Sequence, residues 1–142
     1  MSPPARLGGF KILKDVFWFS LSLPAESLEV PARLLRLLAG EKINLPYITC
    51  LNERSGWGVN MAVDATNGPR SLKILRDSLA DPFHHAPGSA ILSVFPHKND
   101  PEITGALFGA LGRGDLGTVA WANSPSALSV ICLLYTSDAA DE

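Results

Sequence analysis

The sequence predicts an α+β fold built from two β-α-β-β-α-β repeats, the second truncated after β-α-β-β, with antiparallel sheets that carry helices on one face. Apolar residues at period two, typical of half-buried strands, alternate along the chain with apolar residues at helical spacing. The order of these patterns is β, α, β, β, α, and it then restarts as β, α, β, β. The composition, 46% hydrophobic and 18% charged over 142 residues, is that of a globular chain that can bury a core.

The first repeat opens with a strand and a helix. In DVFWFSLSL, apolar residues at positions 17, 19, 21 and 23 alternate with Trp18 and two serines, which predicts a strand with one face on a core, ended by Pro24. The next stretch, SLEVPARLLRLLAG, changes to helical spacing. Pro31 fits the first turn of this helix and Gly40 its C-terminal cap.

A hairpin and a second helix follow in the first repeat. LPYITCLN and WGVNMAVDA predict two strands joined by the polar link ERSG. NGPRSLKILRDSL predicts a helix capped by Asn67 or Gly68. The next segment, DPFHHAPG, is ambiguous and is expected to form at most a brief edge strand.

The second repeat begins with the predicted strand SAILSVFPH and the helix NDPEITGALFGALG, with Asp100 as N-cap and Gly112 as terminator. LGTVAWAN and ALSVI predict the next two strands. No second helix and no final strand follow in this repeat. We therefore expect a partly uncovered sheet face around Leu128, Val130 and Ile131.

The last eleven residues, 132–142, resemble the conceptual translation of a sequencing adapter. This resemblance implies a non-native tail and a truncated reading frame, whereas the alternative is a genuine exposed acidic tail. Without the three acidic residues of this tail, the chain has 12 basic and 11 acidic side chains, a formal charge of +1 in place of −2. The basic residues are scattered, so neither nucleic acid nor an anionic membrane is expected as a partner.

Cysteine usage and the N-terminus predict a cytoplasmic protein. With Cys132 in the tail, Cys50 is alone in an apolar strand, where we expect a buried thiol that behaves as a small hydrophobe. The N-terminus lacks the apolar segment of a secretory signal, and no run reaches the ~18 apolar residues of a membrane span.

Motifs for chemistry are weak. GRGDLG has the glycine spacing of a dinucleotide site, but it follows a helix and precedes a strand, so we interpret it as a cap and loop. His84, His85 and His97 lack the spacing of a zinc site and are expected at the surface or on an edge strand. No serine lies in a nucleophile elbow. No catalytic residue, metal or cofactor is predicted.

The duplicated pattern resembles a tandem pair of ACT domains, ferredoxin-like βαββαβ modules, and is most similar to the regulatory half of aspartokinases. The resemblance lies in the turn AGEKINL that enters a strand, in PFHHAPGSAILSVF between the repeats, and in the strand-turn-strand segment VAWANSPSALSVI. It implies a disordered N-terminus over residues 1–9, a first domain over 10–88, an incomplete second domain over 89–131 and the tail 132–142. No kinase domain precedes the pair in this sequence, so the resemblance does not imply phosphoryl transfer.

ACT-like modules bind amino acids at the loop between the first strand and the first helix, often across a paired module. The helix N-terminus there favours a carboxylate. Carried onto the second repeat, the resemblance implies a ligand site of His97, Lys98, Asn99, Asp100, Asn123, Ser124 and Ser126. The corresponding first-repeat residues are Glu26, Ser27, Asn52 and Glu53. Helix capping by Asp100 and turn formation by residues 123–126 are the structural alternatives.

The sequence therefore predicts a regulatory or sensor module that binds a small molecule, an amino-acid effector, and has no catalytic activity. A homodimer formed through the ACT-like sheets or helices is the expected assembly. The alternative is a homo-oligomerisation or partner-docking module without a ligand, which would use exposed sheet edges and Trp18 or Trp121.

Overall fold

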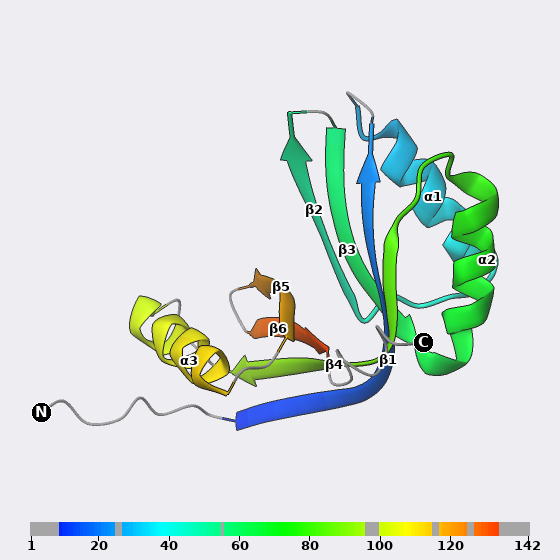
Figure 1. Ribbon diagram of the computed structural model, residues 1–142. Helices are drawn as coiled ribbons and strands as arrows, with labels where there is room; N and C mark the ends of the chain where they lie inside the picture. The colour runs from blue at the N-terminus through cyan, green and yellow to red at the C-terminus, as the bar shows by residue number, and fades with distance from the viewer. Residues whose placement is uncertain are drawn as a thin grey trace, which may run out of the picture. The chain divides into compact units, whose positions relative to one another are not determined.

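The structure is a computed structural model that describes residues 9–24, 27–54, 56–95, 100–114, 117–124 and 127–133 (Figure 1). The chain divides into two compact units. The first unit is Asp15–Gly88, and the second unit combines residues up to Lys14 with those from Ser89 onward. This division differs from the boundary expected at residue 10, because residues 10–14 belong to the second unit and Gly9 already lies in a strand.

The first unit has the β-α-β-β-α-β order of a ferredoxin-like fold. Its elements are β1 (Gly9–Leu23, from Asp15), α1 (Glu29–Gly40), β2 (Tyr47–Glu53), β3 (Gly56–Asp64), α2 (Gly68–Ser78) and the start of β4 (His84–Phe95). The strand order is β2-β3-β1-β4, and β3 pairs antiparallel with both β1 and β2. Figure 1 shows α1 and α2 on one side of these strands. The predicted α+β class with helices on one face is confirmed.

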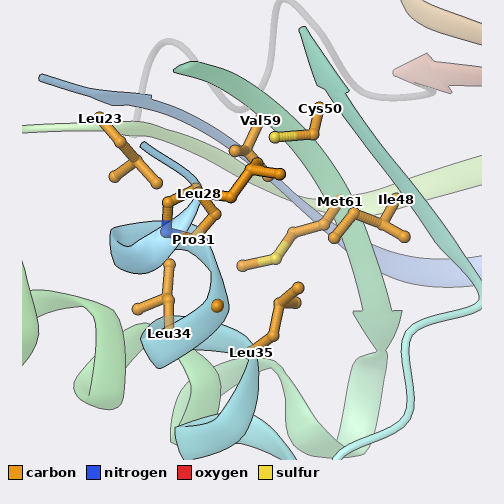
Figure 2. Close-up of a pocket in the computed structure, with 10 residues that line it drawn as sticks. Leu23, Leu28, Pro31, Leu34, Leu35, Ile48, Cys50, Val59 and Met61 are labelled. Atoms are coloured by element: carbon orange, nitrogen blue, oxygen red, sulfur yellow. The ribbon is translucent and has the colours of Figure 1, made fainter. Parts of the chain in front are cut away.

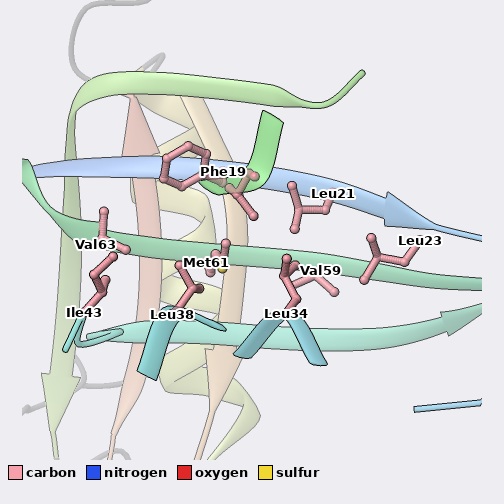
Figure 3. Packing of buried hydrophobic residues seen from close by; sticks show 10 residues of the cluster. Phe19, Leu21, Leu23, Leu34, Leu38, Ile43, Val59, Met61 and Val63 are labelled. Atoms are coloured by element: carbon pink, nitrogen blue, oxygen red, sulfur yellow. The ribbon is translucent and has the colours of Figure 1, made fainter. Parts of the chain in front are cut away.

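The core of the first unit lies between this sheet and its two helices (Figure 3). Register explains why one face is apolar: Phe19 pairs with Met61, and Met61 pairs with Ile48, so their side chains lie on the same face. Leu34 and Leu38, one helical turn apart, point from α1 toward this face. The buried cluster is Phe19, Leu21, Leu23, Leu34, Leu38, Ile43, Val59, Met61, Val63 and Leu75.

The end of α1 differs in detail from the prediction. Gly40 is the last helical residue, and the left-handed conformation that closes many helices is adopted by Lys42, with φ 59°. The backbone N–H of Ile43 donates to the carbonyl of Leu38 at 3.0 Å, which satisfies one of the last carbonyls of the helix. Between β3 and α2 the chain forms a short 3₁₀ turn, Ala65–Asn67.

β1 and β4 are longer than predicted, because each continues through a residue with positive φ. Asp15 in β1 has φ 58°, and Gly88 in β4 has φ 68°. Both residues lie at the boundaries of the first unit. The expected short edge strand at residues 81–88 and the strand from residue 89 are therefore parts of one strand, His84–Phe95.

The second unit contains α3 (Pro101–Arg113), β5 (Gly117–Asn123), β6 (Leu128–Leu133) and the end of β4, with strand order β4-β6-β5. β6 pairs antiparallel with both neighbours, and a register shift interrupts β5 between Thr118 and Ala120. The α3 helix passes the predicted terminator Gly112 and ends at Arg113, with Gly114 as its C-cap. Gly9 lies beside the ring of Phe95 in this unit.

The expected uncovered face of the second unit is wrong. Leu128, Val130 and Ile131 are fully buried, and side chains of α3 pack against Val130. β6 also continues two residues past Ile131. Cys132, assigned from the sequence to the tail, is buried in this strand opposite Ala90 and Thr118. The rest of the predicted tail, 134–142, lies outside the described residues.

Candidate ligand-binding site

Three residues of the ligand site predicted in the second unit are described by the structure: Asp100, Asn123 and Ser124. Asp100 and Ser124 have local structural roles. Asp100 caps α3, since its Oδ1 accepts a hydrogen bond from the Glu102 backbone N–H at 2.9 Å. Asn123 ends β5 opposite Leu128. The backbone N–H of Ser124 donates to the Ala127 carbonyl at 2.9 Å and closes the β5–β6 turn. The other predicted residues, His97, Lys98, Asn99 and Ser126, lie outside the described residues.

The polar residues named for the first unit also lie at element ends. The Ser27 Oγ accepts a hydrogen bond from the backbone N–H of Glu29, at 3.2 Å, at the start of α1. Asn52 and Glu53 end β2, and both are exposed. The Glu53 carboxylate lies over Gly58, where a larger residue would displace it. Glu26 lies outside the described residues.

An apolar pocket adjoins the N-terminal half of α1 (Figure 2). It has a volume of about 240 Å³, and we call it the α1–β2 pocket. Two walls come from α1 and from the edge strand β2, and its floor comes from β1 and β3. The lining residues are Leu23, Leu28, Pro31, Ala32, Leu34, Leu35, Ile48, Cys50, Val59 and Met61.

Strand register explains how β2 supplies one wall. Ile48 pairs with Met61 and Cys50 pairs with Val59, so both β2 side chains lie on the face of the sheet that α1 covers. Because β2 is an edge strand, Cys50 is exposed, and the prediction of a buried thiol is wrong. Partial desolvation raises the pKa of Cys50, which keeps the thiol neutral near pH 7. The pocket wall is therefore uncharged.

The size and lining of the α1–β2 pocket limit what it can hold. Pockets for drug-sized ligands and cofactors have volumes of roughly 300–1,000 Å³, so this one suits a small aliphatic group better than a nucleotide. Among the described residues that line it, none is an acid, a base or a nucleophile apart from the neutral Cys50 thiol. Among the described residues no group of three metal-ligating side chains occurs, and no described helix is long and apolar enough to cross a membrane.

The pocket was not predicted from the sequence. Leu28 and Leu35 line the pocket together with two β2 residues. Neither belongs to the apolar stripe that helical spacing predicts for α1, which is Val30, Leu34, Leu37 and Leu38. The sequence did contain an indication of an additional apolar surface, because the segment that forms α1 has more leucines than a single core-facing stripe requires. That indication does not reveal that β2 is the edge strand beside these leucines.

The fold occurs in solved structures of aspartate kinases, although no known family model and no curated protein sequence matches the chain. The regulatory subunit of aspartate kinase from Thermus flavus has a TM-score of 0.80 at 20% identity, covering 94% of this chain and 93% of that chain. The ligand-free regulatory subunit from Thermus thermophilus has a TM-score of 0.79 at 20% identity, covering 95% and 94%. Escherichia coli aspartokinase III in complex with lysine and aspartate has a TM-score of 0.64 at 17% identity, covering 88% of this chain and 29% of that chain. The TM-scores indicate a shared fold.

Proposed function

We propose that this chain is a regulatory module that binds an amino acid and has no catalytic activity of its own. The observation that carries the proposal is the α1–β2 pocket, an apolar cavity beside the first strand-to-helix connection of the first unit. The shared fold supports a regulatory role, since the similar chains from both Thermus species are regulatory subunits. The cytoplasmic location expected from the sequence belongs to the same proposal.

The pocket favours an amino acid with an aliphatic side chain. Such a side chain would enter between Leu28, Leu35 and Ile48, where it gains about 25 cal/mol for each Å² of apolar surface removed from water. Its α-carboxylate would lie at the mouth, near the first turn of α1, where the helix dipole favours a negative charge. The exposed carboxylate of Glu29, in that turn, would accept from the α-ammonium group.

The second unit carries a second proposed site. Of the sequence-predicted set, His97, Lys98, Asn99 and Asp100 belong to the strand-to-helix connection before α3, and Asn123, Ser124 and Ser126 belong to the end of β5 and its connection to β6. Asp100 there also caps α3.

Calorimetry of the full chain with leucine, methionine, aspartate and lysine tests the first site. We expect the two aliphatic amino acids to bind more tightly than the charged ones. Ala32→Phe, which would fill the pocket from α1, should abolish binding. Ala39→Phe is the matched control, since Ala39 lies on the exposed side of the same helix. Absence of binding by all four amino acids at millimolar concentration would contradict the proposal for this pocket.

A homo-oligomerisation module is the second candidate, favoured by the exposed apolar edge of the first unit. Leu51 on the edge strand β2 is 68% exposed, and such an edge offers free backbone groups to a second strand. Trp18 is a weaker anchor than expected, because it is partly buried and its Nε1 donates to Asn60 Oδ1 at 3.0 Å. Light scattering separates the candidates: a ligand-independent dimer dissociated by Leu51→Lys supports association through β2.

A further inference from the structure

A second cavity of the first unit lies where α2 ends and the chain returns to β4. It has a volume of about 420 Å³ and shares no lining residue with the α1–β2 pocket. Arg76 enters it from the last turn of α2, and His85 from the second position of β4. The connection between these elements supplies the rest of the lining: Leu79, Ala80, Asp81, Pro82 and Phe83.

The cavity brings together a guanidinium group and an imidazole. Arg76 is exposed and makes no hydrogen bond or ion pair with the part of the chain that the structure describes, whereas the nearby Asp77 is paired with Lys73 at 3.4 Å. Burial lowers the pKa of His85, and the positive charges of Arg76 and His84 lower it further. The two groups thus interact unfavourably when His85 is protonated, and an anion between them would relieve that repulsion.

Aromatic neighbours hold the imidazole of His85 in place. Its ring stacks on Phe17 with centroids 5.8 Å apart, and it lies 6.0 Å from the ring of Phe83. Phe83 in turn packs against the buried Phe19, with centroids 6.2 Å apart. The cavity therefore has an apolar wall, made by Phe83 with Leu79 and Pro82, next to its two basic groups.

We propose that this cavity binds a small monocarboxylate with a flat apolar body, its carboxylate held between Arg76 and His85 and its apolar body against Phe83. A planar carboxylate matches the paired donors of a guanidinium group. Inorganic phosphate has no apolar body to place against Phe83, Leu79 and Pro82, so this lining favours a carboxylate that carries one.

The proposal predicts how binding depends on pH. A bound carboxylate stabilises the protonated imidazole, so the pKa of His85 should rise on binding, and affinity should increase as the pH falls through that pKa. Four charged or titratable groups decide this behaviour: His85 itself, Arg76 from α2, His84 on the same strand and Asp81 from the connection. The carboxylate of Asp81, which lines the cavity, opposes binding of the anion.

NMR titration of the full chain with benzoate, from about pH 8 to about pH 5.5, tests the proposal. We expect resonances of Arg76, Phe83 and His85 to shift, with tighter binding at the lower pH. Benzamide, the neutral analogue of the same shape, and inorganic phosphate should both bind more weakly. Binding by benzamide equal to that of benzoate, stronger binding by phosphate, or no shift at about 50 mM benzoate overturns the proposal.

Two variants and a matched control locate the site. Arg76→Gln should weaken benzoate binding about tenfold, the loss expected for one hydrogen bond to a charged group. His85→Gln should remove the pH dependence of benzoate binding. Arg33 is an exposed arginine on α1, and Arg33→Gln should change neither the affinity for benzoate nor its pH dependence. Unchanged affinity in Arg76→Gln overturns the proposal. If a variant fails to fold, the pKa of His85 is measured in the unaltered chain with and without benzoate, and an unchanged pKa overturns the proposal. Ala32→Phe, which fills the α1–β2 pocket, should leave benzoate binding unchanged if benzoate binds in this cavity.

Discussion

Replacing Gly68 with alanine should destabilise the first unit, although the backbone conformation there suits any residue. Gly68 begins α2 with φ −59° and ψ −55°, an ordinary helical geometry. A Cβ at this position would lie 2.8 Å from Cγ and 3.1 Å from Cβ of Phe17, and closer still to its Cδ2. These atoms are near the root of the Phe17 side chain, so a small rotation at its far end does not relieve the clash.

The surroundings of Phe17 set the size of the effect. Its ring stacks on Phe19, with centroids 4.8 Å apart, and on His85, so any movement disturbs the edge of the core. Overpacking of this kind costs about 1–3 kcal/mol. The lower conformational entropy of alanine in the unfolded chain offsets about 0.4–1 kcal/mol of that cost. We expect a net decrease of about 1–2 kcal/mol in the free energy of unfolding.

Urea denaturation of the full chain, followed by tryptophan fluorescence, measures this decrease. Phe17→Leu in the same background should restore part of the loss, so that the two substitutions are non-additive in a double-mutant cycle. Gly40→Ala is the matched control, because nothing lies within 4 Å of its Cβ position, and it should be neutral or slightly stabilising. Equal stability of Gly68→Ala and the unaltered chain, or additive effects in the cycle, would refute the reasoning.

Three further predictions concern polar groups. Ser71 is fully buried and its Oγ lacks a hydrogen-bond partner among the described residues. Ser71→Ala should therefore raise the free energy of unfolding, measured by urea denaturation, by about 1 kcal/mol. A decrease would contradict this prediction. Asp100→Ala should cost about 0.5–2 kcal/mol by removing the cap on the Glu102 N–H, and Asp100→Asn should not; equal losses in thermal unfolding would show that the cap is not the cause. Because the pKa of His85 is lowered in the folded chain, the unfolded chain binds more protons below about pH 6.5. The free energy of unfolding should therefore fall as the pH decreases through that range, and it should fall less steeply in His85→Gln. The same dependence of the urea midpoint on pH in both proteins would disprove this prediction.

Local patterns in the sequence predicted the elements well, because their causes are local. Alternation of apolar and polar side chains is sufficient to predict a strand through Phe19 and its neighbours. The spacing of Asp100 and Pro101 before an apolar stripe is sufficient to predict where α3 begins. The start of β1 was missed because its exposed apolar residues, Phe10 and Ile12, have even numbers, whereas the residues that this strand contributes to the core cluster of the first unit have odd numbers. Asp15, with its positive φ, interrupts the alternation between them.

Features that depend on strand order were not predictable in this way. Cys50 was expected to be buried because its strand is apolar, but its exposure follows from the edge position of β2, which alternation does not encode. The burial of Ile131 likewise depends on tertiary packing, which alternation along one strand does not encode. The α1–β2 pocket joins residues of four elements, so only the assembled unit reveals it. In the second unit, Asp100 was correctly predicted as a cap, and its role toward a ligand stays a prediction.

The division of β1 between the two units affects the order in which the chain can fold during synthesis. The first unit is one continuous segment and can fold as soon as Gly88 has been made and released. The second unit needs residues 9–14, which are made early, together with β6, which ends at Leu133. At about 5–20 residues per second, the early segment waits about 6–24 s for its partners. During that interval the segment lacks its partners in the second unit, so slower translation should increase misassembly of the second unit more than of the first.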